Sequence, residues 1–244
     1  MTSRDRTLTN STRPKESYFL QTLLVFLLID AVFISLFIAR DFLLDANYNI
    51  GFLRSDFWEI DRDGGFPEIY QYLKATFAAT LFGSLFVKQR RAAYLAWFLA
   101  FSYVLVDDLF QLHETFGNFL LANFNLPTVW NIESFLYVEP LLWGAVGLLL
   151  MSLITYAYVY DPKTRVLSRR LLYLFALLFL FAGLADAVHA YVDKYGSSLS
   201  YVKGITVTLE DGGEMLAMSV LVAYVFSYYH AATARSKSRP FFGP

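Results

Sequence analysis

The chain has 244 residues, of which 57% are hydrophobic, 18% are aromatic and only 17% are charged. A soluble domain usually carries about 25% charged residues, so this composition, with a mean hydropathy of +0.44, indicates one membrane-embedded bundle. The net charge of -1 argues against a nucleic-acid partner, and the absence of cysteine excludes disulfides and thiolate metal ligands.

Six segments are long enough and apolar enough to cross a bilayer, which takes roughly 20 residues of helix. They cover residues 18–38, 68–88, 92–114, 135–160, 169–192 and 204–230. The third, fifth and sixth qualify only if several ionisable residues are tolerated within them. We therefore predict an all-α integral membrane domain over 18–231, flanked by tails at 1–17 and 232–244.

The first segment follows a polar, basic leader, as a secretory signal does. A signal has an apolar core of roughly 7–15 residues and a small-residue cleavage site. Residues 18–38 form a longer run with no clear site, so we expect them to remain as a helix.

Basic residues alternate from loop to loop along the chain. The turns around Lys88 and Lys163 and both tails are rich in Lys and Arg, whereas residues 115–131 contain neither. The positive-inside rule then places both termini in the cytoplasm and the odd-numbered loops outside. The first loop, 39–67, is too long for a simple turn, and its aromatic residues predict an ordered lid or interfacial segment.

Ionisable residues are costly inside a bilayer, so those within the predicted spans identify the candidate site. In the third span, Asp107, Gln111 and Glu114 fall on one helical stripe, and Asp108 lies beside it. His113 points away from this stripe in a regular helix. It can join the others only if the helix ends or unwinds at that point.

Two further spans carry acidic residues at a matching depth. Asp186 and His189 are three residues apart, and Glu210 and Glu214 are four apart, so each pair shares a helix face. At 1.5 Å per residue, Asp107, Asp186, Lys74 and Glu210 all lie roughly 8 Å below the outer surface. The sequence therefore predicts one polar layer near that surface.

Acids outnumber bases in this layer, because Lys74 is the only cation at that depth. The acids are Asp107, Asp108, Glu114, Glu139, Asp186, Glu210, Asp211 and Glu214. The excess must be protonated, solvated in a water-filled cavity or bound to metal. Structural interpretations compete: Lys74 paired with one carboxylate, a hydrogen-bonded core histidine, and Gly212-Gly213 serving only close helix packing.

Our first hypothesis is a metal-dependent membrane enzyme, a hydrolase or oxidase. The predicted metal ligands are Asp107, His113, Asp186, His189, Glu210 and Glu214. The candidate catalytic residues are Lys74, Asp108 and Glu114. Lys74 or a spare carboxylate would transfer protons, and Asp108, His113 or Glu114 would complete the metal shell. The donor set fits iron, manganese or catalytic zinc, with calcium as a further alternative. The substrate would be a membrane lipid or another apolar molecule, entering from the outer leaflet under the first loop.

Two other functions also explain intramembrane acids. One is a transporter or channel for protons or divalent cations, although the inner half of the predicted bundle is almost wholly apolar. The other is a non-catalytic subunit or sensor in which a bound cation stabilises the bundle. The sequence does not separate these functions from an enzyme.

Four sequence blocks carry a resemblance to a known group. They are Gln71-Tyr72-x-Lys74, Asp107-Asp108-x4-His113-Glu114, Asp186-x-x-His189 and Glu210-Asp211-Gly212-Gly213-Glu214-Met215. The chain resembles a group of bacterial multi-pass membrane proteins that has no assigned activity. The resemblance implies a bacterial origin and no chemistry. Together with the loop charges, it predicts an inner-membrane protein whose site lies toward the periplasm.

A second comparison shows a departure. Membrane hydrolases of the alkaline ceramidase type use three histidines, an aspartate and a serine. This chain has three histidines in all, and we expect His230 at the opposite, cytoplasmic end. Close membership of that family is therefore disfavoured.

Overall fold

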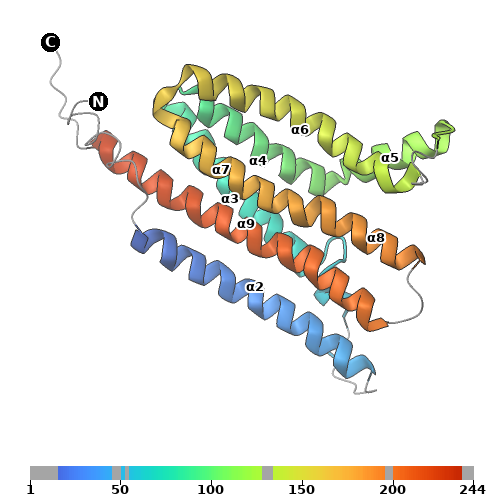
Figure 1. The fold of residues 1–244 in the computed structure, drawn as a ribbon. Coiled ribbons are helices and arrows are strands. Elements are labelled where there is room, and N and C mark those ends of the chain that lie inside the picture. Colours follow the sequence, from blue (N-terminus) through green and yellow to red (C-terminus); the bar gives the residue numbers. More distant parts are fainter. Residues whose placement is uncertain (1–15, 46–50, 53–54, 128–133, 196–199, 238–244) are drawn as a thin grey trace, which may run out of the picture.

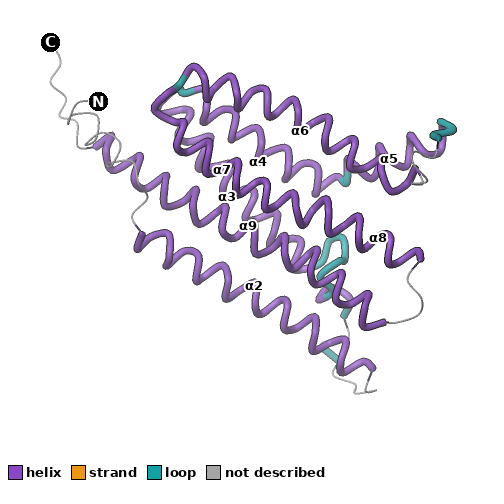
Figure 2. Tube along the Cα trace, in the orientation of Figure 1, coloured by secondary structure: helices purple, strands orange, loops and turns teal. Residues whose placement is uncertain are grey.

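The computed structural model describes residues 16–45, 51–52, 55–127, 134–195 and 200–237. Within these ranges the chain is helical and contains no strand (Figure 2). The predicted tails fall mostly outside them. The side chains of Glu139 and Asp186 also lie outside the described part, although their backbone belongs to helices.

The long helices run side by side as one bundle (Figure 1). In chain order they are α2 (Glu16–Asp45), α3 (Phe66–Gln89), α4 (Ala92–Phe110), α5 (Leu112–Asn123), α6 (Ser134–Tyr160), α7 (Arg165–Phe179), α8 (Asp186–Tyr195) and α9 (Ser200–Lys237). A π-helical segment, Leu180–Ala185, joins α7 to α8 in one continuous run. Short 3-10 turns lie at Asp56–Trp58 and Pro162–Thr164.

Within the described part of the chain, five helical stretches are long and apolar enough to cross a membrane. They are Ser17–Arg40, Ala92–Phe110, Pro140–Tyr160, Pro162–His189 and Gly204–Ala234. The second predicted segment, 68–88, does form helix α3, but it is not among the five. Polar residues such as Gln71 and Lys74 lower its hydropathy. The fold class is therefore confirmed as an all-helical bundle with several apolar spans.

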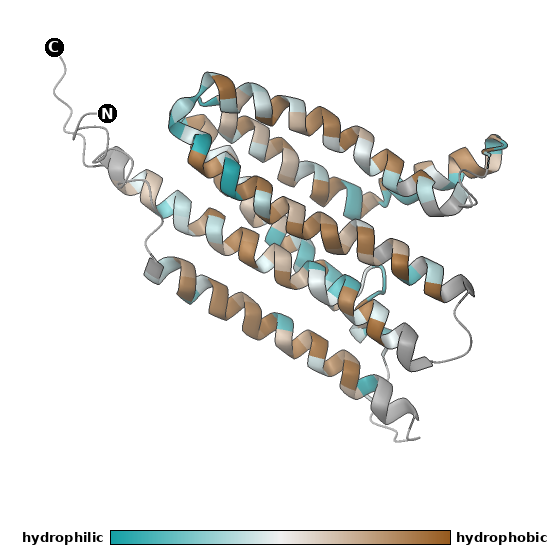
Figure 3. Ribbon diagram, in the orientation of Figure 1, coloured by the Kyte–Doolittle hydropathy of each residue, from teal (hydrophilic) through white to brown (hydrophobic). Residues whose placement is uncertain are grey.

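Helices α3, α4 and α9 form the core, because α3 packs between the other two. Their contacts bury Ala78, Phe82, Leu85, Trp97, Phe101, Leu221 and Val225. The outer helices keep large apolar side chains exposed, with Leu28 of α2 68% exposed and Leu148 of α6 74% exposed. Figure 3 shows this apolar colouring along α2, α6 and α7. Extended apolar surface of this kind marks contact with lipid or with a partner.

Contacts between distant segments bring the basic turns to one end of the bundle. The α3–α4 turn contacts the α6–α7 turn through an ion pair, Arg91 Nη1 to Asp161 Oδ1, at 2.7 Å. Lys88 donates to the Tyr229 hydroxyl of α9 at 3.1 Å. The Tyr18 ring of α2 stacks on His230, near the end of α9. The loops that the sequence analysis found to be rich in Lys and Arg therefore lie together at one end of the bundle.

The described residues of the first loop between α2 and α3, 51–52 and 55–65, lie at the opposite end of the bundle. The ring centroid of Trp58 lies 4.8 Å from those of Phe52 and Phe66. Arg40 Nη2 contacts Asp56 Oδ1 at 3.1 Å and Glu59 Oε1 at 2.7 Å. The loop is thus aromatic-rich and tied to the end of α2.

The expected third span is too long by one turn. Helix α4 ends at Phe110, where Gln111 adopts a left-handed conformation with φ 47° and ψ 47°. A second helix, α5, follows where a loop over 115–131 was expected. This break decides the position of His113.

Candidate functional site

One chamber of about 1100 Å³ opens among the loop before α3 and helices α3, α4, α6, α7 and α9. Its polar end collects Asp63, Glu68, Gln71, Asp108, Gln111, His113, Glu114, Glu210, Asp211 and Glu214. The predicted residues Asp108, His113, Glu114, Glu210 and Glu214 therefore face a shared space. Volumes of roughly 300–1,000 Å³ are usual for ligand pockets, so this chamber can hold a sizeable molecule.

The chamber also has a long apolar part. Helix α4 contributes Trp97, Ala100 and Val104 to its wall, and Phe175 of α7 and Leu148 of α6 line the opposite sides. From Trp97 to Asp108 is eleven residues, or about 16 Å along a helix. The chamber is therefore amphipathic: acidic at one end and apolar over the rest of its length.

Asp107 and His113 form a hydrogen-bonded dyad at the end of α4. The left-handed Gln111 turns the chain back, so that His113 Nδ1 lies 2.8 Å from Asp107 Oδ2. The His113 backbone N–H and the Tyr103 hydroxyl both donate to Asp107 Oδ1, each at 3.2 Å. Asp107 is fully buried behind the histidine. The helix break that the sequence analysis required for His113 to join the site is present.

His189 and Glu210 form a second dyad, which connects α8 to α9. His189 Nδ1 lies 2.5 Å from Glu210 Oε2. Glu210 lines the chamber together with Glu214, as expected for residues four apart on one helix face. The pairing of His189 with α9 could not be read from the sequence, because the two residues belong to different helices.

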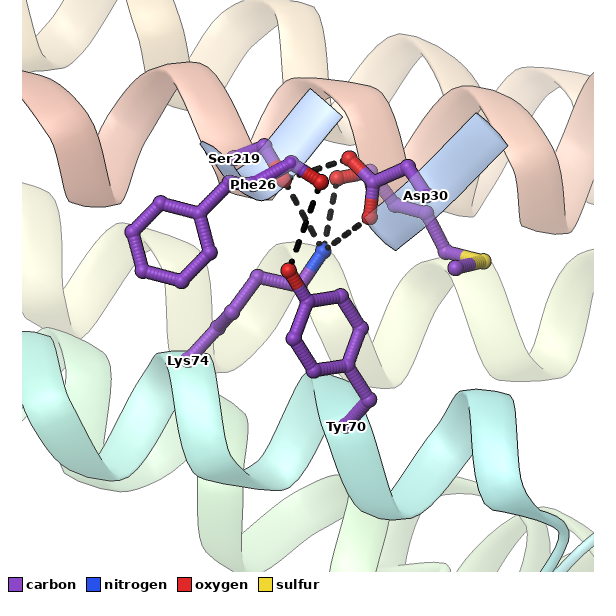
Figure 4. Close-up of polar contacts among 6 residues, drawn as sticks. Phe26, Asp30, Tyr70, Lys74 and Ser219 are labelled. Carbon is purple, nitrogen blue, oxygen red and sulfur yellow. Dashed lines mark hydrogen bonds and ion pairs between the residues drawn. The ribbon is translucent and has the colours of Figure 1, made fainter. Parts of the chain in front are cut away.

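Lys74 is not in the chamber. Its side chain is 0% exposed, and its Nζ donates to Asp30 Oδ1 at 2.9 Å, to the Met215 carbonyl at 2.9 Å and to Ser219 Oγ at 3.1 Å. Ser219 Oγ in turn donates to Asp30 Oδ2 at 2.5 Å. Figure 4 shows these groups converging from α2, α3 and α9, with the Tyr70 ring 4.4 Å from the ammonium.

Asp30, the buried partner of Lys74, is the ionisable residue that the sequence analysis missed. Its signal was a single carboxylate in the middle of an apolar run, which needs a buried cation as its partner. Lys74 was the one cation at hand. Of the interpretations weighed above, the structure matches a Lys74–carboxylate pair, and it leaves Lys74 without access to a substrate in the chamber.

The predicted metal ligands whose side chains are described lie in pairs. Among the described residues, no group of three or more His, Asp and Glu side chains could hold a metal ion. The structure instead arranges these residues as two separate dyads plus chamber-lining carboxylates. Asp186, the remaining predicted ligand, has its side chain outside the described part.

Gly213 serves close packing, as the structural interpretation of the glycine pair proposed. A Cβ on Gly213 would lie 2.2 Å from Cδ1 of Phe181, a residue of the π-helical segment. A Cβ on Gly212 would lie 3.4 Å from Cδ1 of Ile34, which is ordinary contact. The two glycines therefore differ in how closely a neighbour approaches them.

Comparisons with known proteins add one relationship. Neither the curated proteins nor the solved structures gave a match. A family described as a domain of unknown function, DUF8692, matches residues 65–228. These residues include α3, α4 and most of α9, and hence both dyads and, except for Asp63, the residues of the acidic end of the chamber. Since residues 65–228 make up more than half of the chain, the chain belongs to the DUF8692 family.

Proposed function

We propose that this protein is an integral membrane enzyme that acts on the polar head of an amphipathic molecule. The chamber carries the proposal, because it joins two histidine–carboxylate dyads to an apolar space about 16 Å long. The apolar tail would lie between α4, α6 and α7. The head would then meet Asp108, Glu114 and Glu214 at the acidic end.

The dyads support acid–base chemistry. A carboxylate that accepts a hydrogen bond from Nδ1–H orients the imidazole and stabilises its protonated form, so Nε2 can accept a proton. In a hydrolysis, one histidine would take a proton from water as the water oxygen bonds to the substrate. A second acid, the other dyad or a chamber carboxylate, would give a proton to the leaving group.

A metal-dependent form of the same enzyme is the second candidate. It is supported by the use of Nδ1 against a carboxylate in both dyads, the arrangement that usually orients a histidine for binding metal through Nε2. His113, His189, Glu214 and Asp186 would supply ligands to iron, manganese or zinc, with calcium less well matched by the nitrogen donors. The first form is favoured, because the described residues offer no three-donor group.

Conduction of ions is less well supported. Among the described residues that line the chamber, all the acids and the histidine lie at one end, and the wall from Val104 to Trp97 and Ile154 is apolar. An ion would therefore have no polar path toward the opposite end. A purely structural cation site would not need the apolar part of the chamber.

The topology is proposed together with the function. Helix α3 would be a sixth crossing, packed between α4 and α9 and neutralised at Lys74 by Asp30. With the basic turns inside, both termini would be cytoplasmic and the acidic end would face the periplasmic side of a bacterial inner membrane. The first loop, whose Ile60 and Asp63 line the chamber, would cover its mouth.

Incubation with lipid tests the proposed function. Purified protein in nanodiscs is mixed with a bacterial lipid extract, and the lipids are compared before and after by mass spectrometry. We expect conversion of one lipid class, reduced by roughly 10²–10⁴-fold in His113→Gln and Glu210→Gln. Asp61→Asn removes an exposed carboxylate that does not line the chamber and should retain full conversion.

The same samples separate the two forms of the enzyme. Conversion by chelated, metal-free protein supports the dyad mechanism. A stoichiometric metal whose removal abolishes conversion selects the metal-dependent form. Folded protein that neither retains nor converts any lipid would contradict both.

A further inference from the structure

The chamber is strongly unbalanced in charge. Seven carboxylates line it, and no Lys or Arg does so among the described residues. The neighbouring cations are already engaged: Lys74 with Asp30, and Arg40 and Arg62 with Asp56. His113 is the one described lining residue that can carry a positive charge, so a phosphate or carboxylate head would meet mostly like charge here, whereas a cationic head would be attracted.

An orphaned acceptor lies at the same end. Gln71 lines the chamber one turn before Lys74, and its Oε1 is buried with no hydrogen-bond partner among the described residues. A buried acceptor without a partner is costly, so such atoms usually mark a missing donor. Asp108 of α4 also lines the chamber, and its carboxylate makes no hydrogen bond within the described chain. Gln71 Oε1 and the Asp108 carboxylate can each accept a hydrogen bond from an N–H group.

Two aromatic rings also line the chamber. Tyr103 and Trp143 line the chamber and meet edge to face, with ring centroids 5.7 Å apart. Trp143 also lies 5.6 Å from the His113 ring. Aromatic faces near carboxylates favour an ammonium group through cation–π attraction.

We propose that the chamber binds an amphiphile with a single apolar chain and a protonated amino head, an alkylammonium-type molecule. The inference rests on the proposed function for the use of the chamber, and it adds the class of head group. The ammonium N–H groups would donate to Gln71 Oε1 and to Asp108, beside the faces of Tyr103 and Trp143. The alkyl chain would extend toward Trp97.

Four probes with one chain and different heads test this inference. Dodecylammonium, dodecyltrimethylammonium, dodecanol and dodecanoate are titrated calorimetrically into the full-length protein in phosphatidylcholine nanodiscs. Empty nanodiscs measure partition into lipid alone. We expect dodecylammonium to bind at least about tenfold more tightly than dodecanol. Dodecyltrimethylammonium, which lacks N–H donors, should fall between them, and dodecanoate should bind most weakly.

Two variants locate the head group. Gln71→Leu removes the orphaned acceptor, and Asp108→Asn removes one charge. Each should weaken dodecylammonium binding by about tenfold and leave dodecanol binding unchanged, whereas Asp61→Asn should change neither. Gln71→Leu should be at least as stable as the parent without ligand, because it removes an unsatisfied buried atom. This stability control separates lost binding from lost folding.

The outcomes separate this inference from the proposed function. Dodecanol or dodecanoate binding as tightly as dodecylammonium would overturn the ammonium head and leave the amphipathic chamber standing. Dodecanoate binding only after Zn²⁺ or Mn²⁺ is added would overturn it in favour of the metal-dependent form. No binding of any probe beyond empty nanodiscs would overturn both the inference and the proposed use of the chamber.

Discussion

Asp30 and Lys74 form an ion pair whose two side chains are completely buried. Two charges taken out of water gain stability from each other only where further hydrogen bonds complete their shells. Ser219 and the Met215 carbonyl supply those bonds, so the pair is satisfied within the protein. The pair fixes how α2 docks on α3 and α9, because a shift of one turn would separate the charges.

Loss of one partner should be far more damaging than loss of both. Asp30→Ala leaves the Lys74 ammonium buried and unpaired, and should reduce the free energy of unfolding by about 3–5 kcal/mol. The double variant Asp30→Leu/Lys74→Met should regain most of that loss, since no charge remains buried. Thermal unfolding in detergent measures both. Asp161→Ala, at the more exposed Arg91 pair, is the control and should cost about 1 kcal/mol or less.

Equal stability of Asp30→Ala and the double variant would mean that the pair is not coupled as the geometry implies. Such a result would also weaken the case for α3 as a membrane crossing, because that crossing depends on neutralisation of Lys74. Asp30 lies in α2, outside the residues that match the family, and we still expect Asp30→Ala to lower the free energy of unfolding.

At this scale the sequence identified most of the ionisable residues that line the chamber, but not their partners. Glu210, Glu214 and Asp108 could be found from helical spacing and depth alone, whereas His113 joins them only because the helix breaks at Gln111. The pairing of His189 with Glu210, and of Lys74 with Asp30, depends on which helices are neighbours. Helical periodicity gives the face of each helix, and it carries no information about the helix across from it.

Helix α9 approaches the π-helical segment closely at one glycine. The Phe181 ring fills the space that a side chain at position 213 would need. A π-helical turn contains more residues than an α-helical turn, so it changes the direction in which the following side chains point. Such segments are frequent at functional sites. Here it precedes Asp186 and His189, so the contact sets the register of the second dyad.

Gly213→Ala should therefore destabilise the protein, whereas Gly212→Ala should not. The new methyl group at 213 forces the Phe181 ring to move, at a cost of about 1–3 kcal/mol. At 212 the nearest atom is 3.4 Å away, and alanine is the better helix former by up to about 1 kcal/mol. Thermal unfolding of the two single variants tests the contrast. Equal effects would show that Phe181 does not pack on Gly213.

The elements show where prediction from sequence reached its limit. Apolar length placed the main helices, because roughly 20 apolar residues have few other fates. The end of α4 at Phe110 was missed because Gln111 is an ordinary helix former, and only its tertiary setting holds it at φ 47°. Helix α5 was missed because its segment is short and mixed in character.

At the scale of the whole molecule, charge is divided between the two ends. Contacts hold the basic α3–α4 and α6–α7 turns together at one end, through Arg91 and Asp161. The chamber's carboxylates lie toward the other end, beside the first loop. A bundle with this polarity has one preferred orientation in a membrane, because basic loops are retained on the cytoplasmic side.

The cysteine-free sequence allows this orientation to be measured directly. Single cysteines are placed at exposed positions: Asn118→Cys on α5, Asp61→Cys in the first loop and Lys163→Cys in the α6–α7 turn. In intact bacterial cells, a membrane-impermeant maleimide should label the first two. Lys163→Cys should be labelled only after the inner membrane is permeabilised, and the cysteine-free parent should never be labelled.

The opposite pattern would turn the chamber mouth toward the cytoplasm. Labelling of Asp61→Cys and Lys163→Cys from the same side would remove α3 as a crossing, since an odd number of spans must separate these two positions in the six-span arrangement.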